Sequence, residues 1–335
     1  MLINKLKIIA EAGVNHNGKL KIAKRLIDLA KKEGAAFVKF QMFKTENHIL
    51  ESAKMAKYQS KNLSSKISQF DMAKKYELNF DEFRKLNNYC KKKKIKFLAS
   101  VFDLESLSNY LKLKSKFIKI PSGEITNYEL LDAISQYNFQ VYLSTGMSNL
   151  NEIKKAINLL KSKKKINNIT IMQCTSDYPS KLSNSNLLTI PMLKKNFNCR
   201  VGYSDHTLGS DSSVIAIALG AEIIEKHITL NKKDKGPDHA ASCDPVEFKK
   251  YMKKMHQSII ILGSNKKKLI NEEKKNISLV RKSIIAKRDI KKNEFFSKNN
   301  LTTKRPGNGI CASNYLKLLG KKSKFNFKKN EKIKI

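Results

Sequence analysis

The sequence predicts an α/β protein, a (β/α)8 barrel followed by a small C-terminal module, and two observations carry that prediction. The chain has 335 residues, which exceeds the usual single domain of about 100 to 200 residues. Up to residue 262, short apolar runs alternate with longer amphipathic segments, which is the pattern of repeated βα units around a parallel sheet. Eight such units are what a (β/α)8 barrel requires.

The eight predicted strands are short runs rich in Ile, Val, Leu and Phe. They span residues 8–12, 36–40, 96–100, 117–120, 140–144, 169–173, 200–203 and 222–226. Segments 20–32, 149–161 and 211–219 between them carry apolar residues at three- and four-residue spacing, as on the buried face of a helix. A doubly wound open sheet is the alternative, but GVNHNG after the first strand is not the GxGxxG turn that such sheets usually carry.

The end of the chain forms a separate small module. We place the barrel at residues 1–265, a charged linker at 266–280 and the module at 281–335. The module contains strand-like runs at SIIA and FFSKNNLTTKR and a loop at RPGNGI. A piece of this size rarely builds a sufficient core of its own, so we expect it to dock on the barrel or on a partner chain.

The formal net charge of +38 is the strongest feature of the composition. It is compatible with nucleic acid, an anionic membrane surface or anionic substrates as partners. The excess is almost entirely Lys, spread along the whole chain beside many Asn and Ile, whereas dedicated phosphate and base recognition tends to recruit Arg to one element. Compositional drift therefore explains the charge, and we predict neither a nucleic-acid nor a membrane partner.

Compartment signals favour the cytoplasm. No apolar run approaches the roughly 20 residues that cross a bilayer, and the start of the chain lacks the long apolar stretch and cleavage site of a signal peptide. Five cysteines are scattered without CxxC spacing, which favours reduced thiols over disulfides or a zinc knuckle.

Two lysines stand inside otherwise apolar strands. Lys39 in FVKFQ and Lys119 in FIKIPSGE must lose their water when the barrel forms, so we expect an anion to neutralise them. Ser122, Ser144 and Ser204 lie at predicted strand ends. With the lysines they predict a socket for a phosphate and a carboxylate at the mouth of the barrel, where active sites of this fold lie.

Two histidines end neighbouring predicted strands. His206 in YSDHT and His227 in EKHITL should lie within a few ångströms of each other, which predicts a shared divalent metal. Glu11, at the end of the first strand, is a candidate general base or water-orienting group. Asp238 follows a Gly-Pro turn and is a candidate ligand for sugar hydroxyls.

A series of ordered motifs extends over nearly the whole chain. They are AEAGVNHNG, VKFQ, KIPSGEITN, STGM, CTSDYP, YSDHT, EKHITL, GPDH and KRPGNGI. In these motifs the chain resembles the N-acetylneuraminate (sialic acid) synthase family, including relatives that make legionaminate and other nonulosonic acids. The resemblance implies a TIM barrel with a C-terminal antifreeze-like (SAF) domain, a domain-swapped homodimer, and condensation of phosphoenolpyruvate with an acylated amino-hexose.

The resemblance also implies roles for individual residues. Catalysis would rest on Glu11, Lys39, Lys119 and His206. Phosphoenolpyruvate would be held through its carboxylate by Lys39 and Ser100 and through its phosphate by Lys119, Ser122, Ser144 and Ser204. The acceptor sugar would meet Gln41, Tyr178, Asp238 and Arg305, and Glu124 and Ser176 complete the substrate-binding set. His206 and His227 would bind manganese, with magnesium or cobalt as alternatives.

Two departures from the family pattern concern contacts, not the reaction. Val101 stands in SVFD where many members read TPFD, and Ser176 stands where some members have Asn. We take N-acetylmannosamine as the first acceptor and 2,4-diacetamido-2,4,6-trideoxymannose, the precursor of a diacetyllegionaminate, as the alternative. The alternative from another class is a basic nucleic-acid-binding protein.

Overall fold

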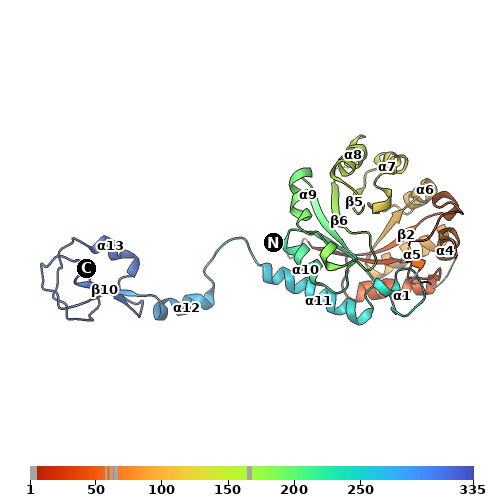
Figure 1. Cartoon of the computed structure of the whole chain (residues 1–335). Helices are drawn as coiled ribbons and strands as arrows, with labels where there is room; N and C mark the ends of the chain where they lie inside the picture. Colours follow the sequence, from red (N-terminus) through yellow and green to blue (C-terminus); the bar gives the residue numbers. More distant parts are fainter. Residues whose placement is uncertain (1–5, 57–58, 61–62, 64–66, 164–167) are drawn as a thin grey trace. The chain divides into compact units, whose positions relative to one another are not determined.

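The computed structural model describes residues 6–56, 59–60, 63, 67–163 and 168–335. The chain divides into two compact units, Met1–Gly263 and Ser264–Ile335 (Figure 1). We describe each unit separately. No helix in the described part of the chain is long and apolar enough to pass through a bilayer.

The first unit is a closed parallel barrel, as the sequence predicts. Within the described residues, eight strands pair in chain order and β8 returns to pair with β1. The strands are β1 (Lys7–Gly13), β2 (Phe37–Met42), β3 (Lys96–Val101), β4 (Phe117–Ile120), β5 (Gln140–Ser144), β6 (Asn168–Cys174), β7 (Arg200–Asp205) and β8 (Ile223–His227). Each overlaps one predicted run, and the ends differ by no more than two residues.

Helices surround the barrel, as Figure 1 shows. They are α1 (Leu20–Lys32), α2 (Thr45–His48), α4 (Gln69–Tyr76), α5 (Phe80–Lys93), α6 (Leu104–Lys112), α7 (Tyr128–Ser135), α8 (Leu150–Lys161), α9 (Thr189–Phe197), α10 (Asp211–Ala218) and α11 (Pro245–Leu262). Capping boxes start several of them; Asn149 and Glu152, for example, satisfy each other's backbone N–H groups at the start of α8. The outward residues of the strands, such as Ile8, Val38 and Val141, join the buried faces of these helices in the main core.

The interior of the barrel is layered because side chains alternate along each strand. Its lower layer is an apolar cluster comprising Ile9, Phe37, Leu98, Tyr142, Met172 and Ile223. Two residues further along the same strands, the inward positions are polar or ionisable: Glu11, Lys39, Ser100, Ser144, Cys174 and Glu225. The apolar cluster therefore forms a floor on which a charged layer rests.

The second unit begins with α12 (Asn271–Val280) and contains β9 (Ser283–Ala286), β10 (Leu301–Lys304) and α13 (Tyr315–Leu318). β9 and β10 pair antiparallel and cover a small core that includes Ile284, Leu301 and Phe327. The prediction of a strand at SIIA is confirmed. The prediction of strand throughout FFSKNNLTTKR is wrong for its first half, where the Asn300 side chain accepts from the backbone N–H of Ser297 and closes a turn.

Candidate active site

Four buried ionisable side chains form the charged layer above the floor. Lys39 Nζ lies 2.8 Å from Glu11 Oε1 and 3.7 Å from Glu225 Oε1. Lys119 Nζ lies 3.3 Å from the same Glu225 oxygen. All four side chains are almost fully excluded from solvent. Their formal charges cancel, so the layer is neutral as a whole while each charge stays close to an opposite one.

Burial and pairing shift these groups in different directions. Burial raises the pKa of Glu11, although the Lys39 ammonium opposes the shift. Burial alone would also raise the pKa of Glu225, but Lys119 and Lys39 outweigh it and hold that pKa at about 2. Burial lowers the pKa of Lys119, whereas for Lys39 the two carboxylates outweigh burial and raise the pKa. Of the two carboxyl groups, Glu225 is held in its charged form more strongly, and Glu11 is better suited to exchanging protons.

Hydroxyl groups surround the two lysines. Lys39 donates to Ser100 Oγ at 3.1 Å, and Ser204 Oγ donates to Glu225 at 3.0 Å. Ser144 Oγ is buried and meets no hydrogen-bond partner among the described residues, and the same holds for the second oxygen of Glu11 and of Glu225. Polar groups buried without partners are costly, so this layer is suited to receive a polar ligand.

Ser122 and Ser176 meet at the next level. Ser122 Oγ accepts from the backbone N–H of Gly146 at 3.0 Å. A Cβ at Gly146 would lie 2.3 Å from Ser176 Oγ and 2.8 Å from Ser122 Oγ, so only glycine leaves room for both hydroxyls here. The structure therefore places Ser176, the residue that departs from the family pattern, beside Ser122.

The two histidines lie above the charged layer. The ring centroids of His206 and His227 are 5.5 Å apart, and the Tyr178 ring lies 4.0 Å from that of His206. His206 Nδ1 donates to the carbonyl of Thr175 at 2.7 Å, and Ser204 Oγ lies 3.5 Å from Nε2, the nitrogen that remains for a ligand. Burial, and then the charge of His206, keep the pKa of His227 well below its usual value, so His227 is neutral.

This pair suits a divalent metal. A metal ligand must be a neutral imidazole with a free nitrogen, and buried His227 Nδ1 has no partner among the described residues. Within the described part of the chain no third His, Cys, Asp or Glu joins them to complete a metal-binding group. Substrate or water oxygens would have to fill the remaining positions, which is usual for a catalytic metal.

A cavity of about 180 Å³ opens beside His227 and Tyr178. Its polar side includes Gln41, Tyr178, His227 and Asp238. Burial, and then the Glu11 carboxylate, raise the pKa of Asp238 to about 6. Apolar lining residues come from the ends of β1 and β3, from the segment after β2 and from α4. They are Val14, Phe43, Ile49, Met72, Ala73 and Phe102, which we call the apolar wall; His48, Gln59 and Gln69 also line the cavity.

The two remaining residues of the predicted set are Glu124 and Arg305. Glu124 is in the turn after β4, where it accepts from Asn127 Nδ2 at 2.7 Å, and burial raises its pKa. Arg305 lies in the second unit, in the loop after β10, and its part in the site remains a prediction.

The sequence reasoning missed Glu225 and the apolar wall. Glu225 is two residues before His227 and therefore faces the same side of β8, so the alternation that placed Lys39 and Lys119 inside the barrel would also have placed their counterion. The apolar wall had no comparable signal, because its residues look like ordinary core positions.

Comparisons with known proteins agree with this geometry. The NeuB family model matches residues 26–267, and a SAF domain model matches residues 281–334. An N,N'-diacetyllegionaminic acid synthase of Campylobacter jejuni is 49% identical over 333 residues, which cover 99% of this chain and 100% of that protein. A protein of the same name from Legionella pneumophila is 38% identical, with 95% of this chain and 90% of that protein covered. The crystal structure of N-acetylneuraminic acid synthetase from Leptospira borgpetersenii, in complex with citrate, has a TM-score of 0.72 at 32% identity and covers 82% of this chain and 91% of that chain.

Proposed function

This chain belongs to the NeuB family, and on that premise we propose that it condenses phosphoenolpyruvate, an acylated amino-hexose and water to a sialic-acid-type sugar acid and phosphate. The observation that carries the proposal is the charged layer. A barrel buries Lys39 and Lys119 beneath two histidines at high cost, and binding of a small, highly charged substrate explains why that cost is tolerated.

Phosphoenolpyruvate fits the lower part of the site. Lys39 and Ser100 would hold its carboxylate, and Lys119 with Ser144 and Ser204 would hold its phosphate. Ser122 would also donate to the phosphate, and Ser176 stands beside it. Lysine, a compact point charge with three donors, suits oxygens that approach from several directions. Glu225 would keep both ammonium groups charged until the substrate anion arrives.

His206 and His227 would hold the divalent metal, with manganese as our first candidate. At that position a bound metal would supply Lewis-acid chemistry at the aldehyde oxygen of the acceptor. His206 is fixed for this purpose by Thr175, and the Tyr178 ring packs against it.

The bond changes follow from this placement. The C2–C3 π electrons of the enol phosphate form the new carbon–carbon bond from C3 to the acceptor aldehyde carbon, the aldehyde oxygen becomes an alkoxide, and C2 becomes cationic. Water adds to C2, and Glu11, a carboxylate with a raised pKa next to Lys39, would take one of its protons and pass it to the new alkoxide. As the ketone forms, phosphate leaves with the electrons of its C–O bond and takes up the second proton of that water. The enclosed site keeps bulk water away from the cationic carbon.

We propose 2,4-diacetamido-2,4,6-trideoxymannose as the acceptor in preference to N-acetylmannosamine. Two relatives that carry the diacetyllegionaminic acid synthase name, at 49% and 38% identity, support this choice. The cavity gives a physical reason. Its polar side would bind the end of the sugar next to the aldehyde, and the apolar wall would then face the methyl group at C6 and the acetyl group at C4. N-acetylmannosamine would bring hydroxyl groups against that wall.

The test is a direct one. Purified protein is incubated with phosphoenolpyruvate, MnCl2 and each acceptor in turn, while phosphate release is followed and the product is identified by mass. We expect both sugars to be used, with a higher kcat/KM for the diacetamido sugar. Phosphate release without a condensed product, or no reaction with either sugar, would contradict the proposed function.

We also propose that the second unit completes the acceptor site of a partner chain within a cytoplasmic homodimer. Arg305 precedes Pro306 and Gly307 in an exposed loop, from which a guanidinium could donate to an acyl carbonyl. Mixing Arg305→Ala chains with Lys119→Ala chains should then restore part of the activity, because one barrel of each heterodimer would combine an intact lysine with an intact arginine. Verified heterodimers without any recovery would exclude this arrangement.

A further inference from the structure

A buried ion pair joins the two strand ends that carry the histidines. Asp205 precedes His206, Lys226 precedes His227, and the two are register partners in the β7–β8 pairing. Lys226 Nζ lies 3.0 Å from Asp205 Oδ2, and the two side chains are 1% and 0% exposed. Because side chains alternate along a strand, this pair lies on the outer face of the barrel, behind the histidines.

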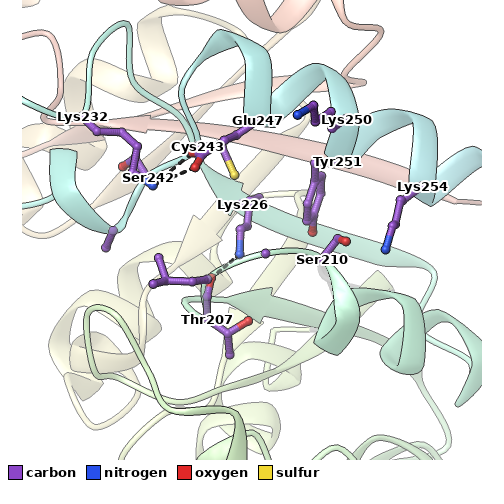
Figure 2. Close-up of a pocket in the computed structure, with 13 residues that line it drawn as sticks. Thr207, Ser210, Lys226, Lys232, Ser242, Cys243, Glu247, Lys250, Tyr251 and Lys254 are labelled. Atoms are coloured by element: carbon purple, nitrogen blue, oxygen red, sulfur yellow. Dashed lines mark hydrogen bonds and ion pairs between the residues drawn. The ribbon is translucent and has the colours of Figure 1, made fainter.

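Asp205 and Lys226 also hold the residue that follows His206. Asp205 Oδ1 accepts from the backbone N–H of Thr207 at 2.9 Å and from its hydroxyl at 2.7 Å. Lys226 Nζ donates to the carbonyl of Thr207, as Figure 2 shows. Ser213 supplies a further donor to Asp205 Oδ2 at 2.6 Å. Every polar group of Thr207 therefore engages this pair or its surroundings.

The surroundings of Lys226 restrict its side chain. It borders a cavity of about 350 Å³ between the loop after β7 and α11 (Figure 2). The Tyr251 ring lies 5.5 Å from Lys226 Nζ, and its hydroxyl hydrogen-bonds Ser213. An apolar pair would fill such a position without the cost of burying two charges, so the ion pair needs a reason other than stability.

We propose that Asp205 and Lys226 are positioning residues that fix the separation and orientation of His206 and His227 for the divalent metal; this inference rests on the proposed function. The pair ties β7 to β8 at the residues directly before the ligands and fixes the backbone directly after His206. On the inner side, Thr175 holds only the ring of His206. Metal binding demands ligand distances within about 0.2 Å of their ideal values. A change that loosens either strand end should therefore lower the affinity for the metal before it unfolds the barrel.

The variant that tests this is the double substitution Asp205→Asn and Lys226→Met. It removes both charges, approximately retains both volumes, and leaves an oxygen to accept from Thr207, whereas either single change leaves a buried charge without its partner. Thr207→Val is a milder second test, since it deletes one donor to Asp205 and no charge. Lys232→Met is the matched control, because Lys232 borders the same cavity but pairs with Glu247 at the surface.

The full-length chain is titrated with MnCl2, and free Mn²⁺ is measured from its paramagnetic resonance signal; circular dichroism and thermal melting report the fold. We expect the folded double variant to bind Mn²⁺ about 10- to 100-fold more weakly, Thr207→Val to shift in the same direction, and Lys232→Met to match the wild type. In the double variant, kcat should recover substantially when Mn²⁺ is raised to saturation.

Wild-type Mn²⁺ affinity in the folded double variant would overturn this inference and leave the proposed function intact. If the double variant does not fold, unchanged affinity in Thr207→Val has the same meaning. A wild-type chain whose Mn²⁺ binding does not depend on His206 and His227 would overturn the proposed metal site and this inference together.

Discussion

Replacing Glu225 with Gln tests the charged layer most directly. The substitution keeps the size of the side chain and an oxygen that accepts from Ser204, but it removes the negative charge 3.3 Å from Lys119 and 3.7 Å from Lys39. At an effective dielectric constant of about 20, each of these separations corresponds to an attraction of about 4 to 5 kcal/mol. Much of this attraction offsets the cost of burying the charges. Removing one partner of a buried ion pair typically destabilises a protein by about 3 to 5 kcal/mol.

We therefore expect Glu225→Gln to lower the free energy of unfolding by about 3 to 5 kcal/mol, a large fraction of the roughly 5 to 15 kcal/mol that holds most domains together. Phosphoenolpyruvate brings its own negative charge to the same lysines. It should therefore stabilise the variant more than the wild type. Urea unfolding with and without saturating phosphoenolpyruvate measures both effects.

The matched control is Glu222→Gln, near the start of the same strand. Glu222 pairs with Arg200 at 3.9 Å, where the arginine is more than half exposed. Surface pairs of this kind contribute about 0 to 1 kcal/mol. A loss in Glu225→Gln no larger than in this control, or equal stabilisation of variant and wild type by phosphoenolpyruvate, would refute the idea that the layer is a charge-balanced receptor for an anion.

Three further predictions concern the reaction. Lys119→Ala should raise the KM for phosphoenolpyruvate at least about 100-fold, in line with the loss of a charged hydrogen-bond partner. The control Lys92→Ala, on the surface, should leave steady-state kinetics unchanged. An equal rise in KM in both variants would point to a general role of positive charge. Asp238 has a pKa of about 6, so the kcat/KM for the acceptor should fall about tenfold per pH unit below pH 6 as the carboxylate is protonated. If the Asp238→Asn variant shows the same fall in kcat/KM at low pH, the titration belongs to another group. Met72→Gln places an amide in the apolar wall. It should reduce the preference for the 6-deoxy acceptor, measured as the ratio of kcat/KM for the two sugars, by about 10-fold or more. An unchanged ratio would show that the apolar wall does not determine the choice of acceptor.

The barrel was predictable because its evidence is periodic. Apolar runs of fixed length, separated by amphipathic helices, leave few topologies open, and the ends of β4 and β5 were placed to the residue. Lys39 and Lys119 were predictable for a related reason, since a charge inside an apolar strand conflicts with its surroundings and draws attention.

What escaped prediction depends on contacts between distant segments. Nothing near Asp205 or Lys226 in the sequence shows that the two side chains meet behind the histidines, because the partners come from different strands. The strand prediction for residues 295–305 failed in its first half because the Asn300 side chain bonds locally to the chain before it. A side chain that hydrogen-bonds to the nearby backbone competes with the hydrogen bonds between strands, and the pattern of apolar residues does not reveal this competition.

The apolar floor of the barrel has a kinetic consequence. Among the described residues, Ile9, Phe37, Tyr142 and their neighbours fill the lower end of the barrel, so we expect the two reactants to enter from the same side. The socket around Lys39 and Lys119 lies below the histidines, and the acceptor cavity lies beside them. A ligand beside the histidines would obstruct the route to the socket below them. We therefore expect a compulsory order of binding, with phosphoenolpyruvate first. An acceptor sugar that binds before phosphoenolpyruvate should prevent phosphoenolpyruvate from binding. Excess sugar would then slow turnover, and raising phosphoenolpyruvate would relieve the inhibition.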